Sequence, residues 1–209
     1  PVRFVFQHME RLTAPITDVL VVVSSENIDK AVGAGIGNRE QYVVIHSGIK
    51  VSDFAAVPRQ KVERTRKEIG LEAGSPVVGM IACLKPQKAP LDFVELARRV
   101  LEKKPETQFV LVGDGVLRSS VLEKAKELGI KDNFVLAGWR RDIPACLQIF
   151  DVLVLTSLWE GLPRVFPEAM SAGKPIVATA VDGAREAILH GLNGYLAAPH
   201  DIDRMSEYV

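Results

Sequence analysis

The sequence predicts an α/β fold, a parallel sheet with helices on both faces, and three observations lead to it. Short runs rich in Val, Ile and Leu alternate with helical patterns along most of the 209 residues. Several of these runs are almost continuously apolar, as strands buried on both faces are. Hydrophobic residues make up 47% and charged residues 25% of the chain, which is typical of a globular protein and excludes a disordered or low-complexity one.

Eight strands are expected, and apolar spacing places helices between them. The strands are predicted at 19–24, 42–46, 77–83, 108–112, 133–137, 152–156, 175–178 and 194–197. One helix is expected over 59–69, and a second holds Leu91, Val94, Ala97, Val100 and Leu101. A third holds Val121, Leu122, Ala125 and Leu128, and Gly129 follows it as a helix-ending residue. Alternating strands and helices indicate a parallel sheet with helices on both faces.

Charge and hydropathy narrow the class of protein. Lys plus Arg equals Asp plus Glu at 26 each, and this balance argues against nucleic acid as a partner. The apolar runs have strand length, short of the roughly 18 residues that a membrane span needs. We expect a cytoplasmic location, with peripheral membrane association left open for the full-length protein. Cys83 and Cys146 are expected to be buried free thiols of a reducing compartment.

Three patterns that suggest cofactor or metal sites have simpler explanations. Glycines over 33–37 resemble part of a dinucleotide-binding motif, but they follow a helical stretch where that motif must follow a strand. Asp201 and Asp203 have the spacing of a carboxylate pair, yet a helix start explains them better. The four histidines share no metal-ligand spacing with each other or with the cysteines. No metal site is therefore predicted.

Parallel sheets bind ligands beyond the carboxyl ends of their strands, so the loops there hold the first candidates. Gly113, Asp114 and Gly115 follow the fourth expected strand and precede a helix. Glycines let the backbone approach a ligand, and the helix start offers free N–H groups to an anion. A tight turn explains these residues equally well. Lys85 and Lys88 follow the third expected strand, where a lysine is either solvated or binds phosphate.

Residues 156–170 form the segment that is richest in candidates. Glu160 stands in the loop after a buried strand, and Glu168 falls on the following helix among apolar neighbours. A carboxylate in such surroundings needs a partner, and paired sugar hydroxyls suit its two acceptor oxygens. Gly161 permits close approach of the backbone. The alternative is a surface glutamate and a first-turn glutamate favoured by the helix dipole.

At this segment the chain resembles the retaining glycosyltransferases of family 4, whose GT-B fold has two facing Rossmann-like domains. The family pattern E-G-x-P…E-A-M-A-x-G-x-P-V-V-A-T reads here Glu160-Gly161-Leu162-Pro163, then Glu168-Ala169-Met170 and onward to Thr179. Further segments match in order, and they are V-G-D-G at 112–115, L-G-x-R-x-D-V at 137–143, G-x-x-E at 183–186 and D-G-x-N-G at 190–194. The resemblance runs from about Thr17 to Asp201.

The resemblance implies a nucleotide-sugar donor site and a role for each matching residue. Glu168 would accept hydrogen bonds from the ribose hydroxyls, and Glu160 would hold hydroxyls of the donor sugar. Lys88 would stabilise the diphosphate leaving group, so Glu160 and Lys88 are the catalytic candidates. The other donor-binding candidates lie in loops expected to border the sugar, the phosphates or the base, and they are Gly161, Leu162, Pro163, Arg164, Gly113, Asp114, Gly115, Gly138, Trp139, Arg140 and Lys85. No metal or other cofactor is expected, because fixed cations and helix N-termini can stabilise the departing charge.

The chain departs from the family pattern in two ways. The family usually has an Arg five residues before Lys88, where this chain has Cys83, and Lys85 is the nearby cation that could substitute. The chain also starts at Pro1, and we expect a piece of a longer protein whose N-terminal acceptor domain is missing. Residues 1–53 are predicted to be the end of that domain with a linker, and residues 54–209 the nucleotide-sugar-binding domain.

The expected activity is retaining transfer of a sugar from a nucleotide sugar to an acceptor, which is a saccharide, a lipid-linked molecule or a small molecule. By itself this chain is expected to bind donor weakly and to transfer little or nothing. A GT-B sugar-nucleotide epimerase is an alternative, against which the E-G-x-P glutamates argue. A non-catalytic nucleotide-binding module is another, which Cys83 keeps open.

Overall fold

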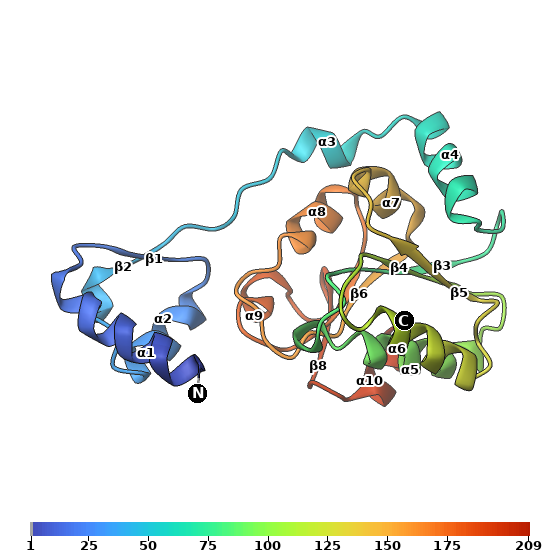
Figure 1. Cartoon of the computed structure of the whole chain (residues 1–209). Helices are drawn as coiled ribbons and strands as arrows, with labels where there is room; N and C mark the ends of the chain where they lie inside the picture. Colours follow the sequence, from blue (N-terminus) through green and yellow to red (C-terminus); the bar gives the residue numbers. More distant parts are fainter. Residues whose placement is uncertain (1) are drawn as a thin grey trace.

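The structure, a computed structural model, describes residues 2–209 as two sheets of unequal size joined by an extended stretch (Figure 1). The small sheet pairs β1 (Leu20–Val22) with β2 (Tyr42–Val44) in parallel. The large sheet has six parallel strands in the order β5-β4-β3-β6-β7-β8. Its strands are β3 (Val77–Ile81), β4 (Gln108–Val112), β5 (Phe134–Gly138), β6 (Val152–Leu155), β7 (Ile176–Thr179) and β8 (Gly194–Ala197).

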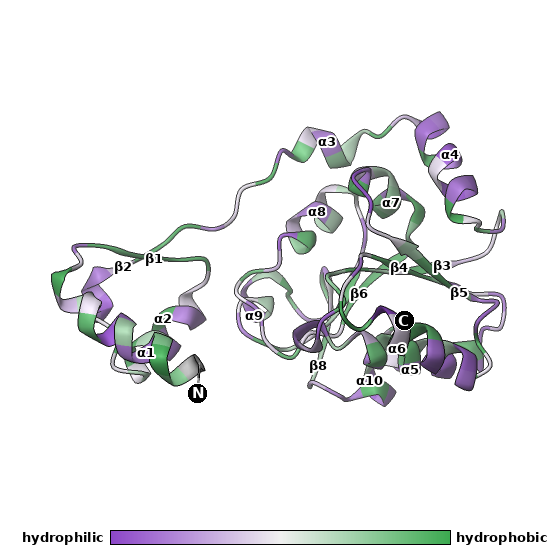
Figure 2. Cartoon of the chain, in the orientation of Figure 1, coloured by the Kyte–Doolittle hydropathy of each residue, from purple (hydrophilic) through white to green (hydrophobic). Residues whose placement is uncertain are grey.

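Helices cover both faces of the large sheet, so the predicted fold class is confirmed. On one face α5 (Pro90–Leu101) packs against α6 (Arg118–Glu127) and α10 (Ile202–Tyr208). On the other face α7 (Ile143–Ile149) packs against α4 (Arg59–Ile69) and α8 (Val165–Ser171). A short α9 (Ala184–Ala187) follows β7. Figure 2 shows the sheet strands mainly in the hydrophobic colour, as two covered faces require.

All eight predicted strands are present, and β4 and β8 have the predicted bounds. The ends of the other strands differ from the predicted ends by at most two residues. The difference that affects the candidate site is at β3, which ends at Ile81 instead of Cys83. The helix predicted over 59–69 is α4. Gly129 follows α6 with a φ of +70°, the left-handed conformation that suits a residue beyond a helix end.

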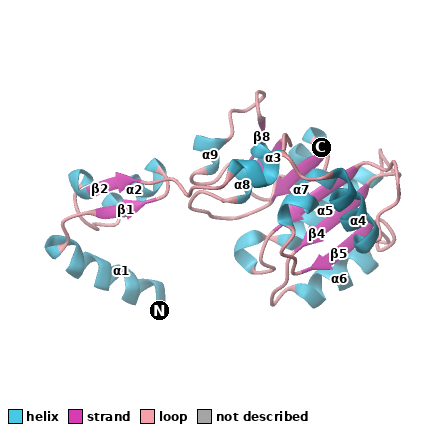
Figure 3. Ribbon diagram, turned by 90° about the horizontal axis from the view of Figure 1, so that it is seen from above, coloured by secondary structure: helices cyan, strands magenta, loops and turns pink. Residues whose placement is uncertain are grey.

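The strand order makes β3 and β6 neighbours at the centre of the sheet. Figure 3 shows this sheet from above, with β4 and β5 toward one side and β8 toward the other. From β3 the chain proceeds outward to β5, then crosses back to β6 and proceeds the other way to β8. In doubly wound sheets a crevice opens at this switch point, beyond the carboxyl ends of the two strands. Residues 82–89, here called the β3 loop, and residues 156–164, here called the β6 loop, meet there.

Residues 2–47, here called the N-terminal segment, contain α1 (Val2–Thr13), β1, α2 (Ser25–Gly33) and β2. The hydrophobic core lies entirely in residues 59–209, here called the sheet unit, and extends from Ile69 to Met205. Between the two, α3 (Val51–Ala55) lies against α7 and α8. The domain boundary predicted between residues 53 and 54 falls within α3 and stays a prediction.

The structure bears on the three sequence patterns that suggest cofactor or metal sites. The glycines over 33–37 form a loop after α2, with left-handed φ angles at Gly35 and Gly37. The Asp201 carboxylate accepts a hydrogen bond from the Arg204 N–H and begins α10. Over residues 2–209 no cluster of three or more His, Cys, Asp or Glu side chains could hold a metal ion. Within the same range no helix has the length and apolar character to cross a bilayer.

Candidate functional site

Lys88 and Glu160 meet at the switch point of the sheet. Lys88 ends the short helix η3 (Pro86–Lys88) in the β3 loop, and Glu160 stands in the β6 loop. The Lys88 ammonium forms an ion pair with the Glu160 carboxylate. Only 18% and 8% of these side chains are exposed, so both charges are largely removed from water and depend on each other. This pair joins the two residues predicted to be catalytic.

Hydrogen bonds fix the β3 loop to the β6 loop. The Thr156 hydroxyl lies 2.9 Å from the carbonyl oxygen of Lys88 and 2.9 Å from that of the next residue. The Leu158 N–H donates to the Gln87 carbonyl at 2.8 Å, and the Gln87 amide donates to the Trp159 carbonyl at 2.7 Å. The backbone around Lys88 is therefore positioned by the residues that directly precede Glu160.

A second set of contacts fixes the far side of the β6 loop to residues 180–183, here called the β7 loop. The Glu160 N–H donates to Oδ2 of Asp182 at 2.5 Å. The Gly183 N–H donates to the Gly161 carbonyl at 3.0 Å. A Cβ at Gly161 would lie 2.7 Å from the Val23 side chain, so this glycine admits the N-terminal segment at close range. Glu160 is thus held between two loops.

Two cavities open beside these loops. One of about 650 Å³ lies between the N-terminal segment and the sheet unit, and it is lined by Asn27, Lys30, Trp159, Glu160 and Asp182. The other, of about 390 Å³, lies beyond the carboxyl ends of β3, β4 and β5, and it is lined by Ile81, Ala82, Cys83, Val112, Gly113, Asp114, Trp139, Arg140 and Ile143. The first holds the sugar-binding candidate, and the second holds the candidates expected to border the base.

The structure explains why the turn Gly113-Asp114-Gly115 has glycine at its first and third positions. Both adopt left-handed φ angles, +143° and +157°. A Cβ on Gly113 would collide with the Ala82 carbonyl, and one on Gly115 would lie 2.6 Å from the Leu84 carbonyl. The backbone of this turn packs against the β3 loop, so the need for a tight turn is enough to explain both glycines. Their contact with a ligand stays a prediction.

The Arg140 guanidinium is occupied by protein partners. It donates to both oxygens of Asp142, at 2.8 and 2.7 Å, and to Glu68 on α4 at 2.9 Å. The hydrogen bonds from Arg140 lower the pKa of Asp142 to about 2. Trp139 beside it is 67% exposed, with the Arg141 guanidinium 5.1 Å from its ring. Trp139 therefore offers exposed ring surface beside the second cavity.

The two cysteines differ, and the prediction that both are buried was wrong for Cys83. Because β3 ends at Ile81, Cys83 lies in the loop at the sheet edge, is exposed and lines the second cavity. Cys146 is buried on α7 as predicted, and burial raises the pKa of its thiol to about 11. Lys85, the cation proposed to replace the family's arginine, is exposed in the same loop.

Glu168 lies on α8, with 15% of its side chain exposed. Its nearest cation is Arg164, whose Nη2 atom is 4.0 Å from the carboxylate. Burial raises the pKa of Glu168, and Arg164 offsets part of that effect. Directly before α8, Pro163 is buried and Leu162 is half-buried, and their contact with a ligand stays a prediction. The structure thus gives Glu168 a desolvated carboxylate with one distant ionic partner among the described residues.

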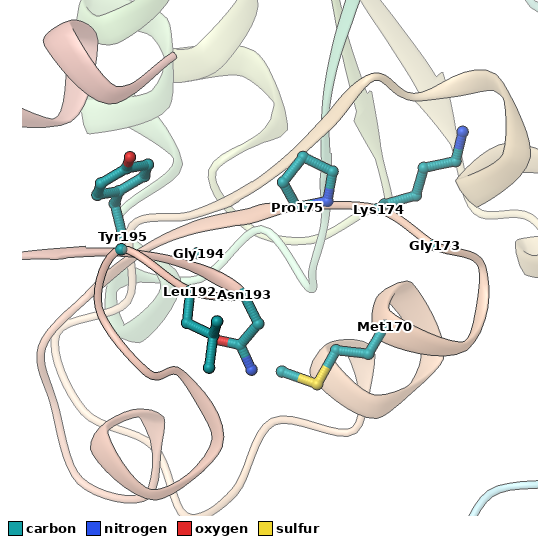
Figure 4. Close-up of a pocket in the computed structure, with 9 residues that line it drawn as sticks. Met170, Gly173, Lys174, Pro175, Leu192, Asn193, Gly194 and Tyr195 are labelled. Carbon is teal, nitrogen blue, oxygen red and sulfur yellow. The ribbon is translucent and has the colours of Figure 1, made fainter.

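The structure joins some of the predicted residues and leaves others apart. Lys88 contacts Glu160, and the turn at 113–115 contacts the β3 loop, but the residue contacts above do not join Glu168 to Lys88. A third cavity of about 420 Å³ lies at the opposite edge of the sheet, where β7 and β8 begin (Figure 4). Its lining includes Met170, Lys174, Leu192, Asn193 and Tyr195 and none of the predicted site residues.

Sequence reasoning missed Asp182, Asn27 and Lys30. Asp182 follows β7 by three residues, so the rule about carboxyl ends of strands could have found it. Asn27 and Lys30 lie on α2, more than a hundred residues before the loops that they meet. No spacing in the sequence brings them to the site, because their position depends on how the N-terminal segment folds back onto the sheet unit.

Comparison with known proteins identifies the family of this chain. The sheet unit matches the carboxyl-terminal Rossmann-like domain of the GT-B fold. A family model described as glycosyl transferases group 1 matches residues 61–209, and the chain belongs to this family.

Relatives and solved structures agree with this assignment. The chain is 33% identical over 205 residues to the UDP-Gal:alpha-D-GlcNAc-diphosphoundecaprenol alpha-1,3-galactosyltransferase of Escherichia coli, covering 97% of this chain and 53% of that protein. It is 27% identical over 192 residues to the 2-deoxystreptamine glucosyltransferase of Streptomyces kanamyceticus, covering 90% of this chain and 50% of that protein. The crystal structure of Anabaena Alr3699/HepE in complex with UDP and glucose matches 96% of this chain and 56% of that chain, with a TM-score of 0.86 and 26% identity. The chain therefore spans about half the length of these proteins.

Proposed function

We propose that this chain forms the donor-binding part of a retaining glycosyltransferase that uses a UDP-sugar. The observation that carries the proposal is the Lys88–Glu160 ion pair at the switch point of the sheet. A cation and a carboxylate side by side suit a ligand that presents an anion next to a group rich in hydroxyls. In a nucleotide sugar the diphosphate is bonded directly to the sugar, so one ligand satisfies both side chains.

Each side chain exchanges its partner when the donor binds. The Lys88 ammonium turns from the Glu160 carboxylate to the diphosphate, where it stabilises the charge that grows as the sugar–phosphate bond breaks. The Glu160 carboxylate accepts hydrogen bonds from the sugar hydroxyls in place of the Lys88 ammonium. Lys85, exposed in the same loop, supplies a second cation where the family usually has an arginine. This electrostatic mechanism needs no metal.

The base and the ribose take the remaining candidates. The cavity lined by Cys83, Gly113 and Trp139 accommodates the base, with the exposed Trp139 ring available for stacking. The Glu168 carboxylate accepts hydrogen bonds from the ribose hydroxyls, which compensates its burial.

Relatives favour uracil as the base and a hexose as the sugar. The similar Anabaena protein has been crystallised with UDP and with UDP-glucose, and the Escherichia coli relative is named for UDP-Gal. The acceptors in the names of relatives range from a lipid diphosphate to 2-deoxystreptamine, so the proposal concerns the donor. Comparison with glycosyltransferases favours neither the epimerase nor the non-catalytic module. We expect the 209-residue chain to bind donor and to transfer little or nothing by itself.

Alkylation of the two cysteines tests the site directly. At pH 8, iodoacetamide should modify the exposed Cys83 and spare Cys146, whose burial and pKa of about 11 make it an internal control. UDP should slow modification of Cys83 at least several-fold, with EDTA present or with Mg²⁺ added. Unchanged reactivity in saturating UDP would contradict the placement of the base, and protection only with Mg²⁺ would contradict the metal-free mechanism.

A further inference from the structure

Asp182 is a buried carboxylate at the site that the proposed function does not use. It lies in the β7 loop with 3% of its surface exposed. Its φ is +45°, a left-handed conformation that residues other than glycine seldom adopt. Such backbone strain persists only where surrounding contacts hold it, and the side-chain contacts of Asp182 lead to the β6 loop and to the N-terminal segment.

Each carboxylate oxygen of Asp182 has a different partner. Oδ2 accepts the hydrogen bond from the Glu160 N–H at 2.5 Å. Oδ1 forms an ion pair with the ammonium of Lys30 on α2. The neighbouring Gly183 packs against the carbonyl of Gly161 so closely that a Cβ there would collide with it. Asp182 therefore connects the backbone of the sugar-binding candidate to the N-terminal segment.

A charge-assisted hydrogen bond to a backbone N–H is among the stronger polar contacts in a protein. Without it the Glu160 N–H would lose its partner, and the loop from Trp159 to Gly161 would have fewer restraints on this side. The Glu160 side chain would keep its ion pair with Lys88 but no longer be held in one orientation toward the cavity. The consequence would appear where Glu160 acts on a ligand.

We propose that Asp182 is a positioning residue that orients Glu160 toward the sugar of the donor, with Lys30 supporting it from the N-terminal segment. The inference rests on the proposed function. It assigns Asp182 no contact with the ligand and predicts that its effect passes through Glu160 alone. Loss of Asp182 should therefore weaken binding of a nucleotide sugar and leave binding of the free nucleotide unchanged.

Two substitutions separate positioning from folding. Asp182→Gly removes the carboxylate and relieves the left-handed strain, so it favours the folded backbone. Asp182→Asn keeps an oxygen acceptor for the Glu160 N–H, tolerates the same φ and loses the charge that pairs with Lys30. Asp203→Asn is the matched control, because it breaks an ion pair between α5 and α10 outside the three loops of the site.

The test is calorimetric titration of the whole chain with UDP and with whichever of UDP-glucose and UDP-galactose it binds more tightly. Asp182→Gly should weaken the UDP-sugar about five- to tenfold and change UDP less than twofold, while Asp182→Asn and Lys30→Met each lose no more than about threefold. Asp182→Gly combined with Glu160→Gln should be no weaker than Glu160→Gln alone, and Asp203→Asn should match the unmodified chain.

The outcomes distinguish failure of the inference from failure of the proposed function. Equal losses for UDP and the UDP-sugar in Asp182→Gly, or losses that add to those of Glu160→Gln, would overturn the positioning role alone. If the unmodified chain bound neither ligand, the proposed function itself would be overturned, and this inference with it.

Discussion

The N-terminal segment and the sheet unit differ in how many apolar side chains each of them buries. In the sheet unit, apolar residues of six strands and their covering helices form one core, in which Phe93, Phe109 and Leu153 have no exposed surface. In the N-terminal segment the described residues include few buried ones, and they are Ala14, Ser24 and Ile28. Many of its large apolar side chains are exposed, namely Phe4, Val5, Phe6, Met9, Leu12, Ile16, Val19, Val21, Val43 and Ile45.

Polar contacts near the site join the N-terminal segment to the sheet unit. The Glu26 N–H at the start of α2 donates to the Glu186 carboxylate at 3.0 Å, and Lys30 pairs with Asp182. The sheet unit therefore provides most of the folding stability and most of the proposed donor site, while the N-terminal segment adds side chains at the rim of that site. Substitutions of the same kind should therefore have different effects in the two regions.

Truncation of one phenylalanine in each region should give the largest contrast. Phe93→Ala removes a fully buried ring and should lower the free energy of unfolding by about 3–5 kcal/mol. Phe6→Ala removes a ring that is 61% exposed and should change it by less than about 0.5 kcal/mol. Urea denaturation of both variants measures the contrast, and a comparable loss for Phe6→Ala would show that the segment has a core of its own.

Two ion pairs give the second contrast. Asp142 is held by Arg140 and by the Thr65 hydroxyl, which donates at 2.9 Å, and its pKa is about 2 against an ordinary value of 3.8. Since the folded-state pKa is lowered, this stabilisation is fully present above about pH 4 and is lost as the pH falls toward 2. Asp142→Asn should cost roughly 1–2 kcal/mol at pH 7, after allowance for solvent screening.

The matched change in the N-terminal segment is Asp29→Asn, since Asp29 pairs with Arg39 and both side chains are 62% exposed. An exposed pair of this kind contributes little, so unfolding should be almost unchanged. Denaturation at pH 7 and pH 3 compares the two variants. If Asp142→Asn kept the full acid dependence of the unmodified chain, another carboxylate would be responsible for it.

Substitution of Glu168 should affect stability less than substitution of Asp142, and with the opposite sign. Burial raises its pKa, so the folded chain binds the proton more tightly than the unfolded chain, and stability falls as the pH rises from the ordinary pKa through the raised one. Glu168→Gln should therefore increase the free energy of unfolding at pH 7. Glu207→Gln is the control, because the Glu207 side chain is 54% exposed, and it should not increase the free energy of unfolding. Destabilisation by Glu168→Gln would mean that its carboxylate has a structural partner.

Much of the sheet unit could be predicted from the sequence, because its strands are continuous apolar runs whose burial leaves few alternatives. The edge where Lys88 and Glu160 meet could be predicted too, since the ligand edge of a parallel sheet follows from strand direction. The exposure of Cys83 could not, because it depends on a strand ending two residues earlier than its apolar run. The contact between Asp182 and Lys30 could not either, since it joins residues far apart in the sequence.

Titration of two glutamate variants with two ligands tests the central claim, that the β6 loop and α8 hold the sugar and the ribose of a UDP-sugar. Glu168→Gln should weaken UDP and the UDP-sugar alike, by about 1.5–3 kcal/mol or roughly ten- to hundredfold. Glu160→Gln should weaken the UDP-sugar by a similar factor and leave UDP no weaker, because the change frees Lys88 for the diphosphate. Equal losses of UDP and the UDP-sugar in Glu160→Gln, or unchanged binding of both in Glu168→Gln, would contradict the account.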